Sequence, residues 1–417
     1  MTRLCTRAAC VLAALAALTA LTIATPATAD PSTHTTGAAG ALPPDQDPFY
    51  RAPADIASFA PGQIVASREV SAKLGTLPVP VKSWQISYRS NSQTGQPILA
   101  VTTLISPTDD WHKRGKRPIV SYQVPEDSVG STCAPSYNIV DGKAGDPGTD
   151  AVVEVARIAP FLAEGWALAI PDHEGPQAYF GVAQESGPIT LDGIRAVKSF
   201  TGDDSIGADS PVGMSGYSGG AQATGWAAQL QPTYAPDLKL TGAALGGLPA
   251  NLAAVGKYLD GGPFAGFEFA VAQSFVRAYP SAGIAALFNQ RGINDLGAMT
   301  GKCQLDILQA FGFRKLERDT TVADPLSVPA IVQVLTLNRL GITSAPQTPI
   351  YDYHAVTDEI VPVGQDNETV QLWRAKGAKV QQGRDLFGEH VKEQAVRMPA
   401  VVSFLRDRFD GKPFDAG

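Results

Sequence analysis

The pentapeptide Gly216-Tyr217-Ser218-Gly219-Gly220 is the pattern in this sequence that points most directly to a chemical reaction. It is a single G-x-S-x-G match, and it follows a short apolar run at 212–216 and opens a helical pattern. In such a nucleophile elbow only very small neighbours leave room for strand and helix to pack around the serine. The helix N-terminus also offers free N–H groups to a developing oxyanion. We predict that Ser218 is a nucleophile; a glycine-rich structural turn is the alternative.

A serine hydroxyl is a weak nucleophile unless a base activates it, so the histidines are the next residues to consider. The chain has five: His34, His112, His173, His354 and His390. The order serine, acid, histidine of α/β-hydrolases excludes the first three, which precede the serine. His354 lies inside an apparent strand, where a packed or hydrogen-bonded role is expected. His390 follows the last strand on a loop near the C-terminus, and we predict that it is the general base.

The acid of such a triad should lie between the serine and the histidine, on the loop after a strand. Asp358 meets this condition, because it follows a strand-like run at 350–355. Asp352 lies within that run, and Glu359 should point away from the site. We therefore favour Asp358, whose carboxylate would orient the imidazole of His390 and stabilise its charged form.

An oxyanion hole needs two N–H donors, one of them from the residue that follows the nucleophile, which is Gly219. The second should come from the loop after the apolar strand at 118–123. On position alone, Glu126, Asp127 and Ser128 are equivalent candidates for it.

The elements that must position these residues alternate between strand and helix. Two β-rich runs at 81–88 and 97–106 predict an antiparallel hairpin. Further strands are expected at 118–123, 167–171, 212–216, 240–245, 350–354 and 380–382, and helices at 151–164, 189–200 and 220–230. This alternation predicts an α/β fold with a mostly parallel sheet flanked by helices, as in an α/β-hydrolase.

The alternation stops between residues 251 and 340, where helical patterns such as 267–279 and 329–340 dominate. Ninety residues exceed an ordinary crossover connection, so we expect an inserted helical cap, or lid, rather than crossover helices. The predicted organisation is a first core part at 47–250, the cap at 251–340 and a second core part at 341–417. Residues 30–46, rich in Ala, Thr, Gly, Pro and Asp, resemble a flexible leader.

The first 29 residues have the order of a secretory signal peptide: Arg3 and Arg7, an apolar stretch, and Ala27-Thr28-Ala29. We predict cleavage near Ala29 and a secreted, soluble product; a membrane anchor is the alternative. Two of the four cysteines would leave with the signal, so Cys133 and Cys303 would remain in an oxidising compartment. A single disulfide is the natural pairing, and two free buried thiols are the alternative.

The net charge of −7 is spread over 417 residues and provides no basic face for nucleic acid. A serine, histidine and aspartate mechanism requires neither a metal nor an organic cofactor. The function class favoured by these residues is therefore a hydrolase acting by acyl transfer. The sequence implies no obligate protein partner.

Longer stretches resemble one known family, the secretory lipases typified by lipase A of Candida antarctica. The matching stretches are Asp47–Tyr50, Ser121–Gln123, Glu126–Ser128, Cys133–Tyr137, Asp172–Gly175, Leu191–Arg195, Gly216–Gly220, Gly261–Phe267, Asp358–Pro362 and Glu389-His390. Together they extend from residue 47 to residue 390, which is nearly the whole length of the chain after the predicted signal peptide. The resemblance implies a triad of Ser218, Asp358 and His390, oxyanion donors from Asp127 and Gly219, a Cys133–Cys303 disulfide and a cap over the acyl pocket.

The implied activity is hydrolysis of carboxylic esters, from short-chain esters to triacylglycerols, with a lipid or small ester as partner and possible contact with a lipid–water interface. The family's type member has a C-terminal flap with a further cysteine bridge, which is expected to be absent here. An acyltransferase, a peptidase or a short-chain carboxylesterase would use the same triad. A non-catalytic surface protein is the alternative from a different class.

Overall fold

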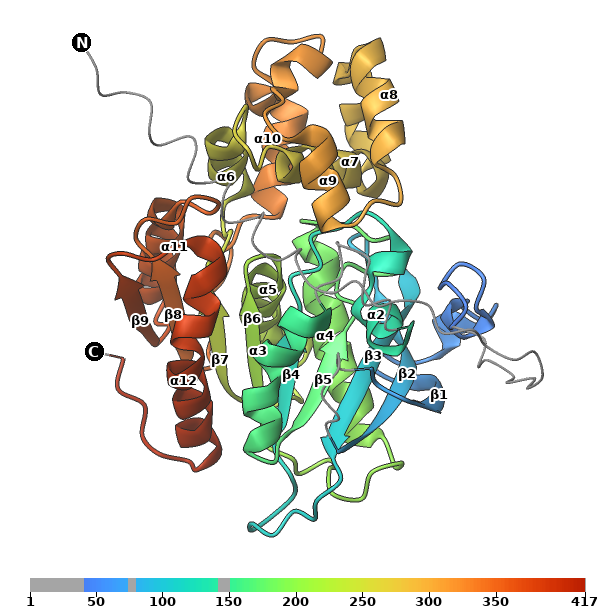
Figure 1. Ribbon diagram of the computed structural model, residues 1–417, viewed down its shortest axis with the longest axis vertical. Coiled ribbons are helices and arrows are strands. Elements are labelled where there is room, and N and C mark those ends of the chain that lie inside the picture. Colours follow the sequence, from blue (N-terminus) through green and yellow to red (C-terminus); the bar gives the residue numbers. More distant parts are fainter. Residues whose placement is uncertain (1–40, 74–79, 142–150, 417) are drawn as a thin grey trace, which may run out of the picture. The chain divides into compact units, whose positions relative to one another are not determined.

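The computed structural model describes residues 41–73, 80–141 and 151–416 (Figure 1). The predicted signal peptide and residues 30–40 of the expected leader lie outside the described residues. The remaining leader residues include a turn in which the Gln46 N–H donates to the carbonyl oxygen of Pro43 at 2.9 Å. Residues 41–417 form one compact unit. Within the described ranges, no helix is both long and apolar enough to cross a membrane.

One sheet organises this unit, with nine strands in the described residues in the order β1-β2-β3-β5-β4-β6-β7-β8-β9. The strands are β1 (Ile64–Val70), β2 (Val81–Asn91), β3 (Pro97–Pro107), β4 (Ile119–Gln123), β5 (Ala167–Pro171), β6 (Val212–Tyr217), β7 (Leu240–Gly246), β8 (Ile350–Ala355) and β9 (Val380–Asp385). β1, β2 and β3 are antiparallel to their neighbours, while β4 to β9 pair with one another in parallel. The predicted hairpin and mostly parallel sheet are confirmed.

Helices cover both faces of the parallel part, which explains why β4, β5, β6 and β8 are buried along their whole length. The helices of this part are α2 (Pro135–Asp141), α3 (Ala151–Ala163), α4 (Ala183–Ser199), α5 (Gly219–Tyr234), α11 (Val363–Ala375) and α12 (His390–Phe409). Side chains of α4, α5 and α11 share one core cluster, and those of α3 and α12 share another. Adjacent residues of β4 separate accordingly: Ile119 joins the first cluster and Val120 the second.

Two details differ from the sequence-based expectations. The edge strand β1 was not expected, because its sequence, IVASREV, includes charged residues and lacks the apolar run of a core strand. The structure agrees with this composition, since β1 is only partly buried. α4 begins at Ala183, six residues before the expected start, with Pro188 inside it. Its first turns are almost entirely buried, so tertiary packing outweighs the weak helical signal of Ser186, Gly187 and Pro188.

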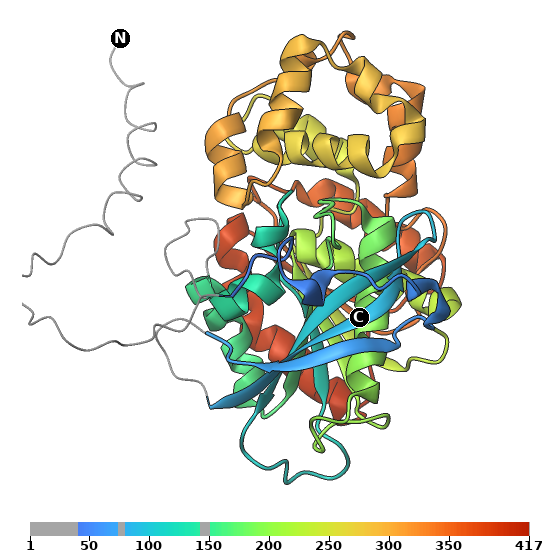
Figure 2. The same cartoon turned by 90° about the vertical axis from the view of Figure 1, so that its right-hand side faces the viewer.

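The helical segment between β7 and β8 lies at one end of the sheet in both views (Figures 1 and 2). Its helices are α6 (Leu252–Leu259), α7 (Gly266–Ala278), α8 (Gln290–Met299), α9 (Gln304–Phe311) and α10 (Pro329–Leu337). Its side chains, among them Phe269, Phe275 and Ile307, form most of a third hydrophobic cluster, which also includes Val129 and Val182 of the core. We refer to residues 251–340 as the cap segment.

Candidate active site

Ser218 lies in a sharp turn between β6 and α5, with a φ angle of +53°, which is rare for a residue other than glycine. The Ser218 N–H donates to the carbonyl oxygen of Gly246 at 2.8 Å and so fixes the turn to β7. A Cβ atom on Gly216 would lie 2.3 Å from the carbonyl oxygen of Gly220. A Cβ atom on Gly220 would lie 2.1 Å from that of Gln123. The glycines are therefore required by close backbone approach, as the motif predicts.

The structure brings the three predicted triad residues into one hydrogen-bonded chain. His390 Nε2 lies 2.9 Å from Ser218 Oγ, and His390 Nδ1 lies 2.6 Å from Asp358 Oδ2. The side chains of Asp358 and His390 are both buried. His390 is the first residue of α12 rather than a loop residue, and its carbonyl oxygen accepts a hydrogen bond from the Tyr217 hydroxyl at 2.5 Å. The tautomer with a proton on Nδ1 leaves Nε2 able to accept the serine proton.

Asp358 is held as a carboxylate by four donors. The backbone N–H groups of Ile360 and Val361 donate to Oδ1 at 2.9 and 2.7 Å. Burial would raise the pKa of Asp358, but hydrogen bonds from His354 and His390 and the charges of both rings hold it well below its usual range. The carboxylate is thus ionised at any pH at which the fold is expected to persist.

His354 forms a second charged layer behind Asp358, as a hydrogen-bonded residue of β8. Its Nδ1 lies 2.9 Å from Asp366 Oδ2, and its Nε2 lies 2.9 Å from the Val361 carbonyl oxygen and 3.2 Å from Asp358 Oδ2. Because acceptors face both nitrogens, the ring must carry two protons. Burial alone would lower the pKa of His354, but its bonds to Asp358 and Asp366 raise it to about 10.

The two rejected acids point elsewhere. Asp352 Oδ2 pairs with Arg384 at 2.6 Å, and Arg384 also reaches Asp366 at 3.0 Å. Glu359 accepts from the backbone N–H of His390 at 3.0 Å, so it holds the start of α12 and does not reach the ring nitrogens. Position on the loop therefore distinguished Asp358 from both.

The loop after β4 contains the three oxyanion candidates, and of these Asp127 alone lines both of the cavities that Ser218 lines. The Glu126 N–H donates to the Val124 carbonyl oxygen at 2.9 Å, and the Ser128 N–H donates to Glu174 at 3.3 Å. Asp127 has a φ angle of +43° and lines the same cavities as Ser218. A Cβ atom on Gly219 would lie 2.0 Å from Asp127 Oδ1, which places this loop directly against the elbow.

Buried acids support this loop from behind. The backbone N–H of His173 donates to Glu126 at 2.8 Å, and the Ser128 hydroxyl donates to Glu174 at 3.1 Å. Burial raises the pKa of Glu126 and of Glu174 well above the ordinary value. Burial also lowers the pKa of His173 to about 4, which leaves that ring neutral.

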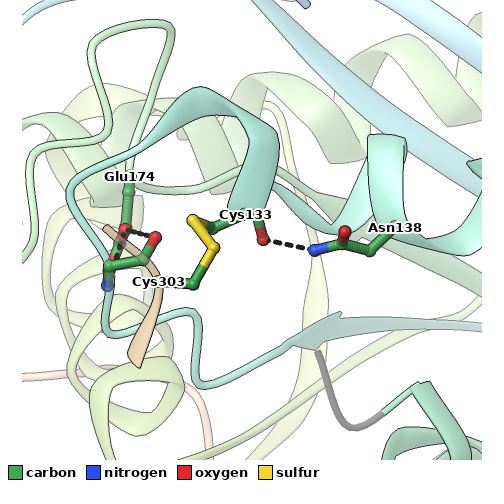
Figure 3. The surroundings of a disulfide bond; sticks show 5 residues. Cys133, Asn138, Glu174 and Cys303 are labelled. Carbon is green, nitrogen blue, oxygen red and sulfur yellow. Dashed lines mark hydrogen bonds between the residues drawn. A yellow bond between two sulfur atoms is a disulfide. The ribbon is translucent and has the colours of Figure 1, made fainter. Parts of the chain in front are cut away.

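The cap segment holds the same loop from the front. Gln304 donates to Asp127 Oδ2 at 2.8 Å, and Val129 exchanges backbone hydrogen bonds with Lys302 and Gly301 at 3.1 and 3.2 Å. The predicted disulfide between Cys133 and Cys303 is present beside this contact, with a Cα–Cα distance of 5.5 Å (Figure 3). Glu174 lies close to the same bridge in Figure 3. Loop and cap segment are thus covalently joined next to Ser218.

Two cavities meet at Ser218 and Asp127. The first, the cap cavity, runs under the cap segment and is lined largely by apolar side chains such as Leu252, Phe267 and Leu335. The second, which we call the open cavity, is lined by His390, by apolar side chains such as Phe264 and Leu308, and by more polar residues than the first, among them Lys73 and Asn138. His390 lines the open cavity but not the cap cavity.

Sequence reasoning missed three features of this site. Gln304 lies far from Asp127 in the chain and carries no motif. Glu174 was noted within Asp172–Gly175 without a role, although an acidic pair beside a buried strand is a signal for a supporting network. Glu268 interrupts the apolar run Phe267–Val271 and lines the cap cavity. In the described ranges, no cluster of three His, Cys, Asp or Glu side chains is arranged to hold a metal ion.

Comparison with known proteins gives consistent matches. The sequence profile of the family described as "Secretory lipase" matches residues 147–417. A Mycobacterium tuberculosis protein described as "Probable inactive lipase" is 35% identical, over 89% of this chain and 84% of its own length. "Lipase 6" of Candida albicans is 34% identical, over 89% of this chain and 82% of its own. The crystal structure of Candida antarctica lipase A in its closed state is 31% identical, with a TM-score of 0.84, and covers 91% of this chain and 89% of that one. The predicted α/β-hydrolase fold is confirmed by that similarity.

Proposed function

This chain belongs to the secretory lipase family, and from that premise we propose that it is a secreted serine hydrolase that cleaves carboxylic esters, with triacylglycerols or shorter esters as substrates. The observation that carries the proposal is the hydrogen-bonded chain from Ser218 through His390 to Asp358. The family match alone would not suffice, because one relative is described as probably inactive.

In the proposed reaction, His390 takes the Ser218 proton as the hydroxyl oxygen attacks the ester carbonyl carbon. The oxyanion of the tetrahedral intermediate forms between Gly219 and Asp127, at the N-terminus of α5. His390 then gives its proton to the alcohol, which leaves, and the acyl group stays on Ser218 as an ester. Water repeats the sequence and releases the acid. Asp358 keeps the ring orientation throughout.

The two cavities support a division of the substrate. The departing alcohol must be near His390 to receive its proton, and the open cavity is lined by that residue. The acyl chain remains on Ser218 and needs an apolar channel, which the cap cavity provides. We therefore assign the acyl chain to the cap cavity and the alcohol to the open cavity.

The first test is replacement of the nucleophile. Ser218→Ala should reduce kcat/KM on a nitrophenyl ester by at least about a thousandfold, since serine-triad nucleophiles typically contribute this much or more. A fluorophosphonate should label the wild type and not the variant. If Ser218→Ala keeps activity within tenfold of the wild type, Ser218 is not the nucleophile. If the fluorophosphonate does not label the wild type, this protein is catalytically inactive.

The second test concerns the substrate. Initial rates on nitrophenyl esters of increasing acyl length and on emulsified triacylglycerol separate a lipase from a short-chain carboxylesterase. Product analysis with added alcohols and with amide analogues separates both from an acyltransferase or a peptidase. We expect hydrolysis of long-chain esters, because the cap cavity is lined mostly by apolar side chains.

A further inference from the structure

Glu268 is an acidic residue in the wall of the largely apolar cap cavity. It lies in the first turn of α7 and is only 7% exposed. Its Oε2 atom is buried and has no hydrogen-bond partner among the described residues. A buried polar atom without a partner is unusual and costly in a folded protein, so its presence in a substrate channel requires an explanation.

The surroundings of Glu268 leave room for its carboxyl group at the cavity wall. Gly256 of the facing helix α6 also lines the cavity, and a Cβ atom added there would lie 3.5 Å from Glu268 Oε1. Burial and the nearby charge of Asp260 raise the pKa of Glu268 to about 8. At neutral pH the group is therefore mainly a carboxylic acid, which can both donate and accept a hydrogen bond.

The geometry points to Glu268 as a specificity-determining residue that hydrogen-bonds a hydroxyl group carried along the acyl chain. This inference rests on the proposed function and on the assignment of the acyl chain to the cap cavity. A saturated acyl chain cannot satisfy the carboxyl group, whereas a chain with a hydroxyl at the matching depth can. Sites with a buried polar group discriminate against ligands that leave it unpaired.

The test compares octadecanoyl esters of one alcohol with their monohydroxy positional isomers. For the wild type, we expect kcat/KM to be higher for one or two adjacent hydroxyl positions than for the plain chain, by about tenfold or more. In Glu268→Leu this preference should disappear, so that kcat/KM for the hydroxylated chains no longer exceeds that for the plain chain. Glu268→Gln keeps a donor and an acceptor in the same volume and should retain most of the preference.

A matched control is Glu185→Gln, since Glu185 is also buried with a raised pKa but lines neither active-site cavity. Its hydroxyl preference should equal that of the wild type. An equal ratio of hydroxylated to plain substrate in wild type and Glu268→Leu would overturn the inference, as would a preference confined to hydroxyls on the alcohol. Failure of the proposed function is distinguishable, because the wild type would then hydrolyse neither these esters nor a short-chain ester.

Discussion

Replacing His354 by glutamine tests whether a charged residue behind the triad tunes its base. The ring nitrogens of His354 and His390 reach the same oxygen of Asp358, at 3.2 and 2.6 Å. The two nitrogens are therefore no more than about 6 Å apart. At that separation two unit charges repel by about 3 kcal/mol at an effective dielectric constant of about 20, which corresponds to roughly a hundredfold in an equilibrium constant. The positive charge of His354 thus opposes protonation of His390.

The expected result is a shift of the acid limb of the kcat/KM profile. In His354→Gln the repulsion is lost, so protonated His390 becomes more favourable and the limb moves to higher pH, by about one to two units. Rates at pH values well above the limb should fall much less than rates below it. The measurement is a pH profile of kcat/KM on a soluble nitrophenyl ester, with the exposed His112→Gln as control. An unmoved limb, or one moved to lower pH, would refute the reasoning.

The same substitution has a stability consequence with a definite sign. Removing one partner of a buried ionic network costs about 3–5 kcal/mol, because Asp366 loses one of its two cationic partners. The pKa of His354 is raised from 6.5 to about 10 in the folded state. The contribution of His354 to the free energy of unfolding is therefore complete below pH 6.5 and is lost as the pH rises through 10. Urea unfolding of both proteins should show a stability difference that narrows over this range.

Two further predictions concern the scaffold around Ser218. Gly220→Ala places a Cβ atom 2.1 Å from a backbone oxygen of β4, so we expect a loss of about 1–3 kcal/mol and at least about tenfold in kcat/KM. The control is Gly297→Ala, because Gly297 is exposed on α8 and no atom lies within 4 Å of the new Cβ. This variant should gain about 0.5–1 kcal/mol in free energy of unfolding. If the two variants behave alike in urea unfolding and ester assays, the close contact at Gly220 is not important. Replacing Cys133 and Cys303 by serine should lower stability by about 2–5 kcal/mol, because the bridge spans 170 residues. If the thermal midpoint of the wild type is the same with and without a reductant, the disulfide does not stabilise the fold.

Much of the candidate site could be predicted from local patterns. The turn of Gly216 to Gly220 is specified by close backbone contacts, which only glycine allows, and so it is visible in the sequence itself. Chain order and loop position then selected His390 and Asp358, because the carboxyl ends of parallel strands meet at one edge of a sheet. The disulfide followed from cysteine count and compartment. These predictions depend on backbone geometry and topology, which hydrophobic periodicity reveals.

The sequence by itself thus predicted the α/β fold, a nucleophile with its base and acid, and a helical insertion. Only the tertiary structure decided which residues far apart in the sequence face one another. It placed Gln304 of the cap segment on Asp127, a charged His354 behind Asp358, and Glu268 in the wall of the cap cavity. Periodicity reports whether a side chain is buried, but not which distant group it meets. For His354 and Glu268, burial and the neighbouring charged groups set the pKa, and only the tertiary structure reveals them.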